Sequence, residues 1–178
     1  MFIYVSGCKM KNILILLFLL SSLVFANEHR LLISGFTKHE HSNRSNGKKY
    51  NEFNLGAGYE FTTFKNYNEF YFGTNVTVLN DSYSNIQYTV SASSNIRFKL
   101  SRHTAISIGV ASFAMWKKDT FKAGVSEDEA KYDLVIGAAP LGSFYYKDLS
   151  VNFAYVPSVS YENVQTVGFA IVYFGWTF

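Results

Sequence analysis

The sequence has few of the residues that build disulfide scaffolds, metal centres or basic surfaces. Its 178 residues include one cysteine, Cys8, and two prolines, Pro140 and Pro157, so neither a disulfide framework nor a cysteine metal site is available. Charged residues make up only 16% of the chain, against about 25% in an average soluble protein. The formal net charge of +3 is too small for a basic nucleic-acid-binding surface, so no nucleic-acid partner is expected.

The chain also lacks an apolar run long enough for a transmembrane helix. The apolar stretch that begins at Ile13 is shorter than the ~18–20 residues needed to cross a bilayer, and no later segment qualifies. Two lysines precede this stretch and small residues ending in Ala26 follow it, which is typical of a secretory signal peptide. We therefore predict a signal peptide over 1–26 and a single domain over 27–178. Cys8 leaves with the signal peptide, and the remaining formal charge is +1.

No helix-period stripe of useful length is present, whereas several segments alternate apolar and polar residues with a period of two, which is typical of β-strands. In residues 52–61 the apolar side chains fall on one face, and the polar or small residues, including Gly56 and Gly58, fall on the other. Residues 86–93 and 149–155 alternate in the same way. With turns placed at clusters of Asn, Ser, Gly, Lys and Asp, the sequence predicts eight strands: 30–38, 50–61, 69–79, 86–98, 104–116, 132–144, 149–157 and 165–178.

The links between these strands alternate in length, because the first, third, fifth and seventh are mostly longer than the others. Long links at one end and short turns at the other are typical of an outer-membrane barrel. We predict an all-β fold, an eight-stranded antiparallel transmembrane β-barrel of the Gram-negative outer membrane. A soluble lipocalin-like barrel or a sandwich is the alternative, and alternation alone does not say which face is the interior. The aromatic content of 18% and the scarcity of charge in the strand centres favour the membrane barrel.

The end of the chain supports the same choice. Val172, Phe174, Trp176 and Phe178 share one face of the last strand, and Phe178 is the final residue. Such an aromatic terminus resembles the signal that outer-membrane barrels present to their assembly machinery, which is therefore an expected partner. The barrel itself is expected to be a monomer.

An eight-stranded barrel is no pore, but it can hold one small ligand, and the candidate chemistry lies at its outer end. His39 and His41 fall at the top of the first strand or in the first outer link, and a histidine can act as a general base near neutral pH. Asp81 and Ser82 fall in the second outer link, where a carboxylate and a hydroxyl can orient an imidazole or bind a polar head group. Solvated loop histidines and an ordinary hairpin turn are the alternatives.

Several short motifs resemble those of the lipid A palmitoyltransferase (PagP-type) barrels, and the resemblance spans nearly all of residues 27–178. These motifs are Tyr50-Asn51-Glu52, Gly56, Gly58, Asp81-Ser82, Pro140-Leu141-Gly142-Ser143 and Tyr155-Val156-Pro157. The resemblance implies an outer-membrane enzyme that moves an acyl chain from a glycerophospholipid to lipid A and needs no cofactor. It also implies that a first-loop histidine is the general base and that Asp81 and Ser82 act beside it.

Three departures from that family affect the site. Strand one begins almost immediately after Ala26, so the family's short amphipathic helix before it is missing. Two histidines stand where the family has one, and neither keeps the family's spacing to Tyr50. We favour His39 over His41 as the base because His39 is closer to the end of the strand.

The two prolines point to a weak place in the barrel wall. Proline cannot donate a hydrogen bond to the ladder, yet Pro140 falls inside the sixth predicted strand and Pro157 ends the seventh. We predict a lateral gate for a lipid tail between these strands, which the resemblance also implies; a bulge and a loop-start proline are the alternative. Gly56, Gly58 and Ser93 place small residues inside the barrel. The resemblance puts Ser93 near a position that limits acyl-chain length, so we expect a chain of palmitate length or shorter.

Two other functions remain open. His41-Ser42-Asn43 resembles the His-x-Ser-Asn core of outer-membrane lipid A deacylases and phospholipases, although the intervening residue is absent. A non-enzymatic adhesin or structural barrel is the third hypothesis, but adhesion requires long loops and these links are short. A change in lipid A mass distinguishes the three: a gain indicates transfer, a loss indicates deacylation, and no change leaves the adhesin.

Overall fold

The computed structural model describes residues 3–4, 28–40, 49–63, 70–118, 131–161, 164–166 and 168–178. Apart from residues 3–4, the predicted signal peptide lies outside these ranges. In chain order the strands are β1 (Ile3–Tyr4), β2 (Glu28–His39), β3 (Gly56–Thr62), β4 (Phe70–Asn80), β5 (Ile86–Lys99), β6 (Thr104–Lys118), β7 (Tyr132–Tyr146), β8 (Leu149–Val156), β9 (Val159–Tyr161), β10 (Val164–Thr166) and β11 (Phe169–Thr177). Within the described residues, no helix is long and apolar enough to cross a membrane.

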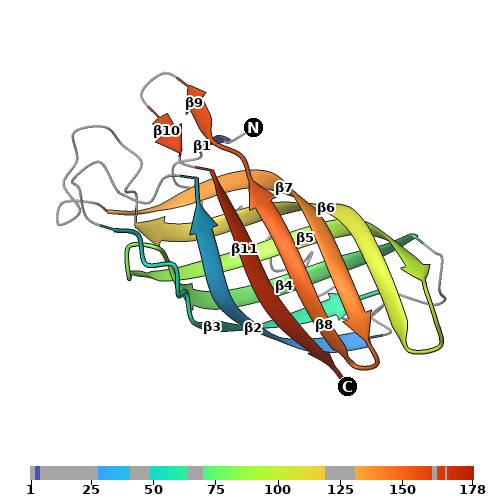
Figure 1. The fold of residues 1–178 in the computed structure, drawn as a ribbon. Helices are drawn as coiled ribbons and strands as arrows, with labels where there is room; N and C mark the ends of the chain where they lie inside the picture. The colour runs from blue at the N-terminus through green and yellow to red at the C-terminus, as the bar shows by residue number, and fades with distance from the viewer. Residues whose placement is uncertain are drawn as a thin grey trace.

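Eight long strands form a closed antiparallel barrel (Figure 1). Consecutive strands pair from β2 to β8, β8 pairs with β11, and β11 pairs with β2, which closes the cylinder. The start of β2 and the end of β11 lie together, because Arg30 is the register partner of Thr177. The short links after β5 and β7 lie at that end, whereas the links after β2, β4, β6 and β8 lie at the other, where Figure 1 shows the β9–β10 hairpin. The predicted eight-stranded barrel is therefore confirmed.

The burial of side chains shows which face is the interior. Many of the most exposed side chains are large and apolar: Ile33, Phe36, Phe72, Ile108, Val110, Phe153, Phe174 and Trp176 are all at least 50% exposed. Many of the most buried are polar or charged, among them Arg30, Thr62, Arg97, Ser107 and Asn152 at 5% or less. This is the reverse of a soluble protein and the pattern of a barrel whose outer face meets lipid. The soluble alternative is thereby excluded.

Two strand boundaries differ from the prediction by four residues or more. β3 begins at Gly56 rather than at residue 50, because the preceding segment makes irregular hydrogen bonds instead of a ladder. The amide of Thr37 donates to the carbonyl of Glu52 at 2.9 Å, and the amide of Asn51 donates to the carbonyl of Ser82 at 2.9 Å. Residues 164–166 form β10 of a separate hairpin, so the last barrel strand starts at Phe169.

One seam of the barrel is only partly paired. The β7–β8 ladder runs from Tyr146–Leu149 to Leu141–Ala154 and ends there. Beyond that point β7 remains paired with β6 as far as Tyr132, and β8 remains paired with β11 as far as Val156. Among the described residues, only β1 pairs with this edge of β7. Its Ile3 and Tyr4 are the register partners of Ile136 and Val135. The break falls next to Pro140, as the missing proline N–H predicts.

Candidate functional site

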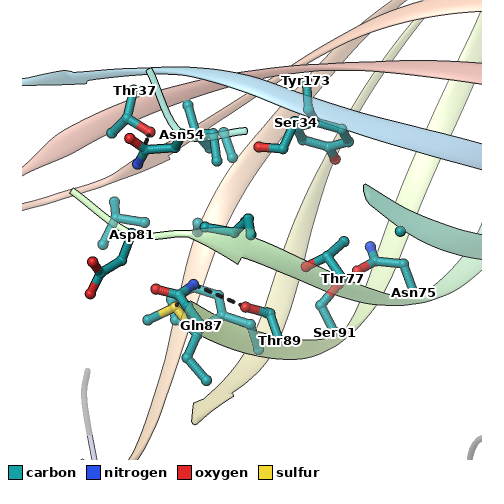
Figure 2. Close-up of a pocket in the computed structure, with 18 of the residues that line it drawn as sticks. Ser34, Thr37, Asn54, Asn75, Thr77, Asp81, Gln87, Thr89, Ser91 and Tyr173 are labelled. Atoms are coloured by element: carbon teal, nitrogen blue, oxygen red, sulfur yellow. Dashed lines mark hydrogen bonds between the residues drawn. The ribbon is translucent and has the colours of Figure 1, made fainter. Parts of the chain in front are cut away.

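A cavity of about 160 Å³ occupies the barrel interior at the end with the long links (Figure 2). Its walls come from all eight barrel strands, and its rim includes Thr37, Asn54, Asp81, Ser82 and Lys117. The alternation seen in the sequence explains this lining, since every second residue of each strand points inward. The predicted Asp81 and Ser82 therefore lie at the mouth of an internal cavity.

His39 is the last residue of β2 and lies at the same end of the barrel. Its side chain is mostly buried, with the residue only 8% exposed. The imidazole stacks on the ring of Tyr50, with ring centroids 4.1 Å apart and an interplanar angle of 9°, and the ring of Phe169 lies 5.8 Å away. Packing between two aromatic rings fixes the imidazole plane. His41 lies outside the described residues, so the choice between the two histidines remains a prediction.

Asp81 shapes the turn between β4 and β5. Its Oδ1 accepts hydrogen bonds from the backbone amides of Tyr83 at 2.9 Å and Asn85 at 2.8 Å, and its own amide donates to the carbonyl of Asn85 at 2.7 Å. An aspartate accepts such local amide bonds readily, which is why it favours turns. Ser84 completes the turn with a φ of 65°. The carboxylate is 2% exposed, and these hydrogen bonds hold it in place at the rim.

The second carboxylate oxygen of Asp81 faces a cation. Its Oδ2 lies 3.8 Å from the Nζ of Lys117, whose side chain is 8% exposed and reaches in from the outer end of β6. The same Nζ lies 5.8 Å from the centroid of the Tyr83 ring. A buried lysine is uncommon unless it is paired, so the carboxylate and the aromatic face together hold this charge at the cavity mouth.

Ser82 is linked to the first strand through Asn54. The side-chain amide of Asn54 donates to the Thr37 Oγ1 at 3.0 Å and to the Ser82 Oγ at 3.2 Å. Asn54 is 3% exposed, so both contacts lie inside the barrel. Because Thr37 precedes His39 by two residues on the inward face of β2, the bridge ties the Ser82 turn to the strand that carries His39.

The small residues predicted for the interior have different roles. Gly58 lines the cavity, and a Cβ at this position would lie only 2.4 Å from the Cγ2 of Thr77. Gly56 permits close approach of the neighbouring strand, since its Cβ would lie 2.3 Å from that of Leu79. Ser93 points inward and is 6% exposed, but it lies beneath the cavity, where the Asn95 amide donates to its Oγ at 2.9 Å. Ser91, two residues nearer the mouth, lines the cavity itself.

Charged and phenolic side chains fill the barrel below Ser93, toward the end with the short links. Arg30, only 1% exposed, places its Nη1 3.3 Å from the Glu60 Oε2. Arg97 places its Nη1 3.6 Å from the Glu28 Oε1, and its guanidinium carbon lies 3.9 Å from the centroid of the Tyr145 ring. These side chains close the lumen below the cavity.

The prolines flank the break in the β7–β8 ladder. Pro140 and Pro157 are both exposed on the outer face. Ala139 and Val156, which precede them, point inward and line the cavity. The unpaired part of the seam therefore separates the cavity from the lipid-facing surface.

Sequence reasoning missed Lys117 and Asn54 as members of the site. Lys117 was placed outside the strand that was predicted to end at residue 116, whereas β6 continues to Lys118. Asn54 stood on the polar face of the alternating segment 52–61, which was the only signal that it points inward. Within the described ranges, no group of three or more His, Cys, Asp or Glu side chains is arranged to hold a metal ion.

The fold and the site together define an outer-membrane barrel that encloses a small-molecule cavity instead of a channel. A family model, "Antimicrobial peptide resistance and lipid A acylation protein PagP", matches residues 20–176. The chain therefore belongs to the PagP family of lipid A acylation proteins.

Comparison with solved structures finds the outer-membrane protein Ail of Yersinia pestis. Its structure in a phospholipid bilayer nanodisc is 12% identical, with a TM-score of 0.39, and covers 85% of this chain and 99% of that one. Its crystal structure is 10% identical, with a TM-score of 0.41, and covers 85% of this chain and 97% of that one. No curated protein matches.

Proposed function

We propose that this barrel moves an acyl chain from a glycerophospholipid to a hydroxyl of lipid A in the outer leaflet. The observation that carries the proposal is the cavity mouth, where Asp81, Ser82 and Lys117 lie at the entrance to the internal cavity at the outer end of the barrel. An acyl chain inside the pocket would hold its ester carbon at that mouth. Membership of the PagP family supports the acceptor, lipid A.

The chemical step needs a base and a polar anchor. His39 removes the proton from a lipid A hydroxyl, and the resulting oxygen attacks the carbonyl carbon of the donor ester. The new carbon–oxygen bond forms, the bond to the glycerol oxygen breaks, and that oxygen receives the proton from the imidazolium. The products are acylated lipid A and a lysophospholipid. Stacking on Tyr50 supports this role, because it holds the imidazole plane in place.

Ser82 and Asp81 have supporting roles in the same step. The Ser82 hydroxyl, which accepts a hydrogen bond from Asn54, is directed to hydrogen-bond the polar end of the donor. Asp81 fixes the turn that carries Ser82 and orients Lys117 toward the mouth. Lys117 then presents its positive charge to the phosphates of the two lipids.

The donor chain enters through the unpaired part of the β7–β8 seam. In support, the ladder ends at Leu141 and Ala154, and Ala139 and Val156 on either side of the break line the cavity. Pro140 and Pro157 keep this stretch short of N–H donors. We infer that the chain is of palmitate length or shorter, since Ser93 and the charged side chains beneath it close the cavity.

The test uses the purified protein in detergent with a dipalmitoyl phospholipid and lipid A, followed by mass spectrometry of lipid A. Wild type should add the mass of one acyl chain. His39→Ala and Ser82→Ala should lose about 10²–10⁴-fold in rate, the usual contribution of a general base, whereas His103→Ala, in the turn at the opposite end, should retain activity. A loss of mass would identify a deacylase, and unchanged lipid A would reject both enzymes in favour of an adhesin or structural barrel.

A further inference from the structure

The cavity has two chemically different walls. The wall formed by β6, β7, β8 and β11 is apolar below the rim, apart from Tyr173 at the bottom. Its apolar residues are Ala111, Phe113, Met115, Ala139, Leu141, Ala154, Val156, Phe169 and Ile171. From β2 to β5 it contains several hydroxyl and amide side chains as well as apolar ones. A pocket for a plain hydrocarbon chain would be apolar on both sides, because burying an unpaired polar group is unfavourable.

Four of these polar residues, Ser34, Asn75, Thr77 and Ser91, lie well below the rim, and we name them the polar belt. Figure 2 shows Ser34 across the cavity from the other three. Asn75 and Ser91 are register partners on β4 and β5, so their side chains lie side by side. Thr77 is the register partner of Gly58, and its Cγ2 occupies the space that a side chain at position 58 would need, 2.4 Å from where a Cβ would lie.

The polar belt is short of hydrogen bonds. The Oγ of Ser34 is fully buried and has no partner among the described residues. Figure 2 draws hydrogen bonds from Asn54 to Thr37 and from Gln87 to Thr89, but none among the four belt residues and the other residues drawn. Buried polar groups in native proteins nearly always have a partner, so an occupant of this cavity is expected to supply one.

The depth of the belt identifies which part of a bound chain it meets. Asn75 precedes Asp81 by six residues, which is about 20 Å along a strand at ~3.3 Å per residue, or about 15 Å of depth at a tilt near 40°. Thr77 lies about 10 Å below the rim by the same reckoning. A chain with its ester at the mouth therefore presents its middle carbons, rather than those beside the ester, to the belt.

We propose that the acyl chain which this protein prefers carries a hydroxyl group near its middle, bonded by the polar belt. This inference rests on the proposed acyl transfer and narrows its preferred donor to phospholipids with a hydroxylated fatty acyl chain. The hydroxyl donates to Ser34 or Asn75 and accepts from Asn75, Thr77 or Ser91, while the apolar wall covers the rest of the chain.

The experiment compares phosphatidylcholines that carry palmitoyl or mid-chain hydroxypalmitoyl groups of equal length, with a myristoyl donor beside them. Acyl transfer to lipid A is followed by mass spectrometry. Wild type should use the hydroxypalmitoyl donor with a kcat/KM about tenfold above that for palmitoyl, the factor of one net hydrogen bond. The Asn75→Leu/Ser91→Ala variant should lose this preference and use both donors equally. Ser112→Ala, on the lipid-facing side of β6, should keep it.

A second measurement does not depend on transfer. Free mid-chain hydroxypalmitate should raise the unfolding temperature of the wild-type barrel more than palmitate does. In Asn75→Leu/Ser91→Ala the two fatty acids should raise it equally. If no donor is used but the hydroxylated fatty acid still raises the unfolding temperature more, the proposed acyl transfer is wrong and the proposed hydroxylated ligand is supported. The hydroxyl proposal is overturned if palmitoyl or myristoyl donors are preferred to hydroxypalmitoyl, or if the double variant keeps the wild-type preference. The first of these results would mean that water fills the belt beneath a plain chain.

Discussion

The ion pair between Arg30 and Glu60 should be the most sensitive point of the barrel floor. Arg30 is 1% exposed and Glu60 8%, and the charged atoms are 3.3 Å apart. At an effective dielectric constant near 20, opposite charges at that distance attract by about 5 kcal/mol. Two further guanidinium nitrogens of Arg30, Nε and Nη2, have no partner among the described residues. Replacing Glu60 with Gln would leave the guanidinium inside the barrel without its counter-charge.

We expect Glu60→Gln to lower the free energy of unfolding by about 3–5 kcal/mol, the usual cost of breaking a buried pair. The double variant Arg30→Met/Glu60→Met should cost less than the single one, because it removes both charges. The matched control is Glu52→Gln, which breaks the exposed pair with Lys38 at 2.8 Å and should cost about 0–1 kcal/mol despite its shorter distance.

The assay is equilibrium unfolding in urea of the barrel folded into lipid vesicles, followed by tryptophan fluorescence and extrapolated linearly to water. A cost below about 1 kcal/mol for Glu60→Gln would show that water or rearrangement screens this charge, and the reasoning would be wrong. The same conclusion would follow if the double variant were no more stable than the single one.

Two further predictions concern the entry seam and the cavity mouth. Residues 27–178 contain no cysteine, and positions 140 and 155 are the next opposed pair beyond Leu141–Ala154, so Pro140→Cys/Tyr155→Cys should form a single disulfide. Acyl transfer, measured by mass spectrometry of lipid A, should be almost abolished in the oxidised protein and restored by a reductant; full activity with the disulfide intact would rule out entry at this seam. Lys117→Met should lower kcat/KM about 10–100-fold, because it removes a charged donor at the mouth, whereas Lys118→Met should change it little. Wild-type kinetics in the Lys117 variant would remove this lysine from the site.

Local patterns were enough to predict much of this architecture. The alternation in 52–61 correctly placed Glu60 inside, and the Asn-Asp-Ser turn correctly placed Asp81 and Ser82 at the outer rim. Pro140 marked the end of the β7–β8 ladder because its effect on hydrogen bonding is intrinsic to the residue.

Features that depend on residues far apart in the sequence were not predicted. The contact between Lys117 and Asp81 joins β6 to the β4–β5 turn. The Arg30–Glu60 pair depends on the register between β2 and β3. Alternation does not determine this register, because a shift of two residues leaves the same side chains facing inward. The early end assigned to the strand before Lys117 had a local cause, since consecutive lysines at 117 and 118 look like a turn.

The closing seam between β2 and β11 has a consequence for how the protein assembles. Its register partners, such as Arg30 with Thr177, come from opposite ends of the folded chain, so the barrel cannot close until the last strand is present. Contacts of such long sequence separation form slowly, and until they form, β2 and the neighbouring edge remain exposed to wrong pairing. We therefore expect closure of the barrel to wait for the pairing of its final nine-residue strand, β11.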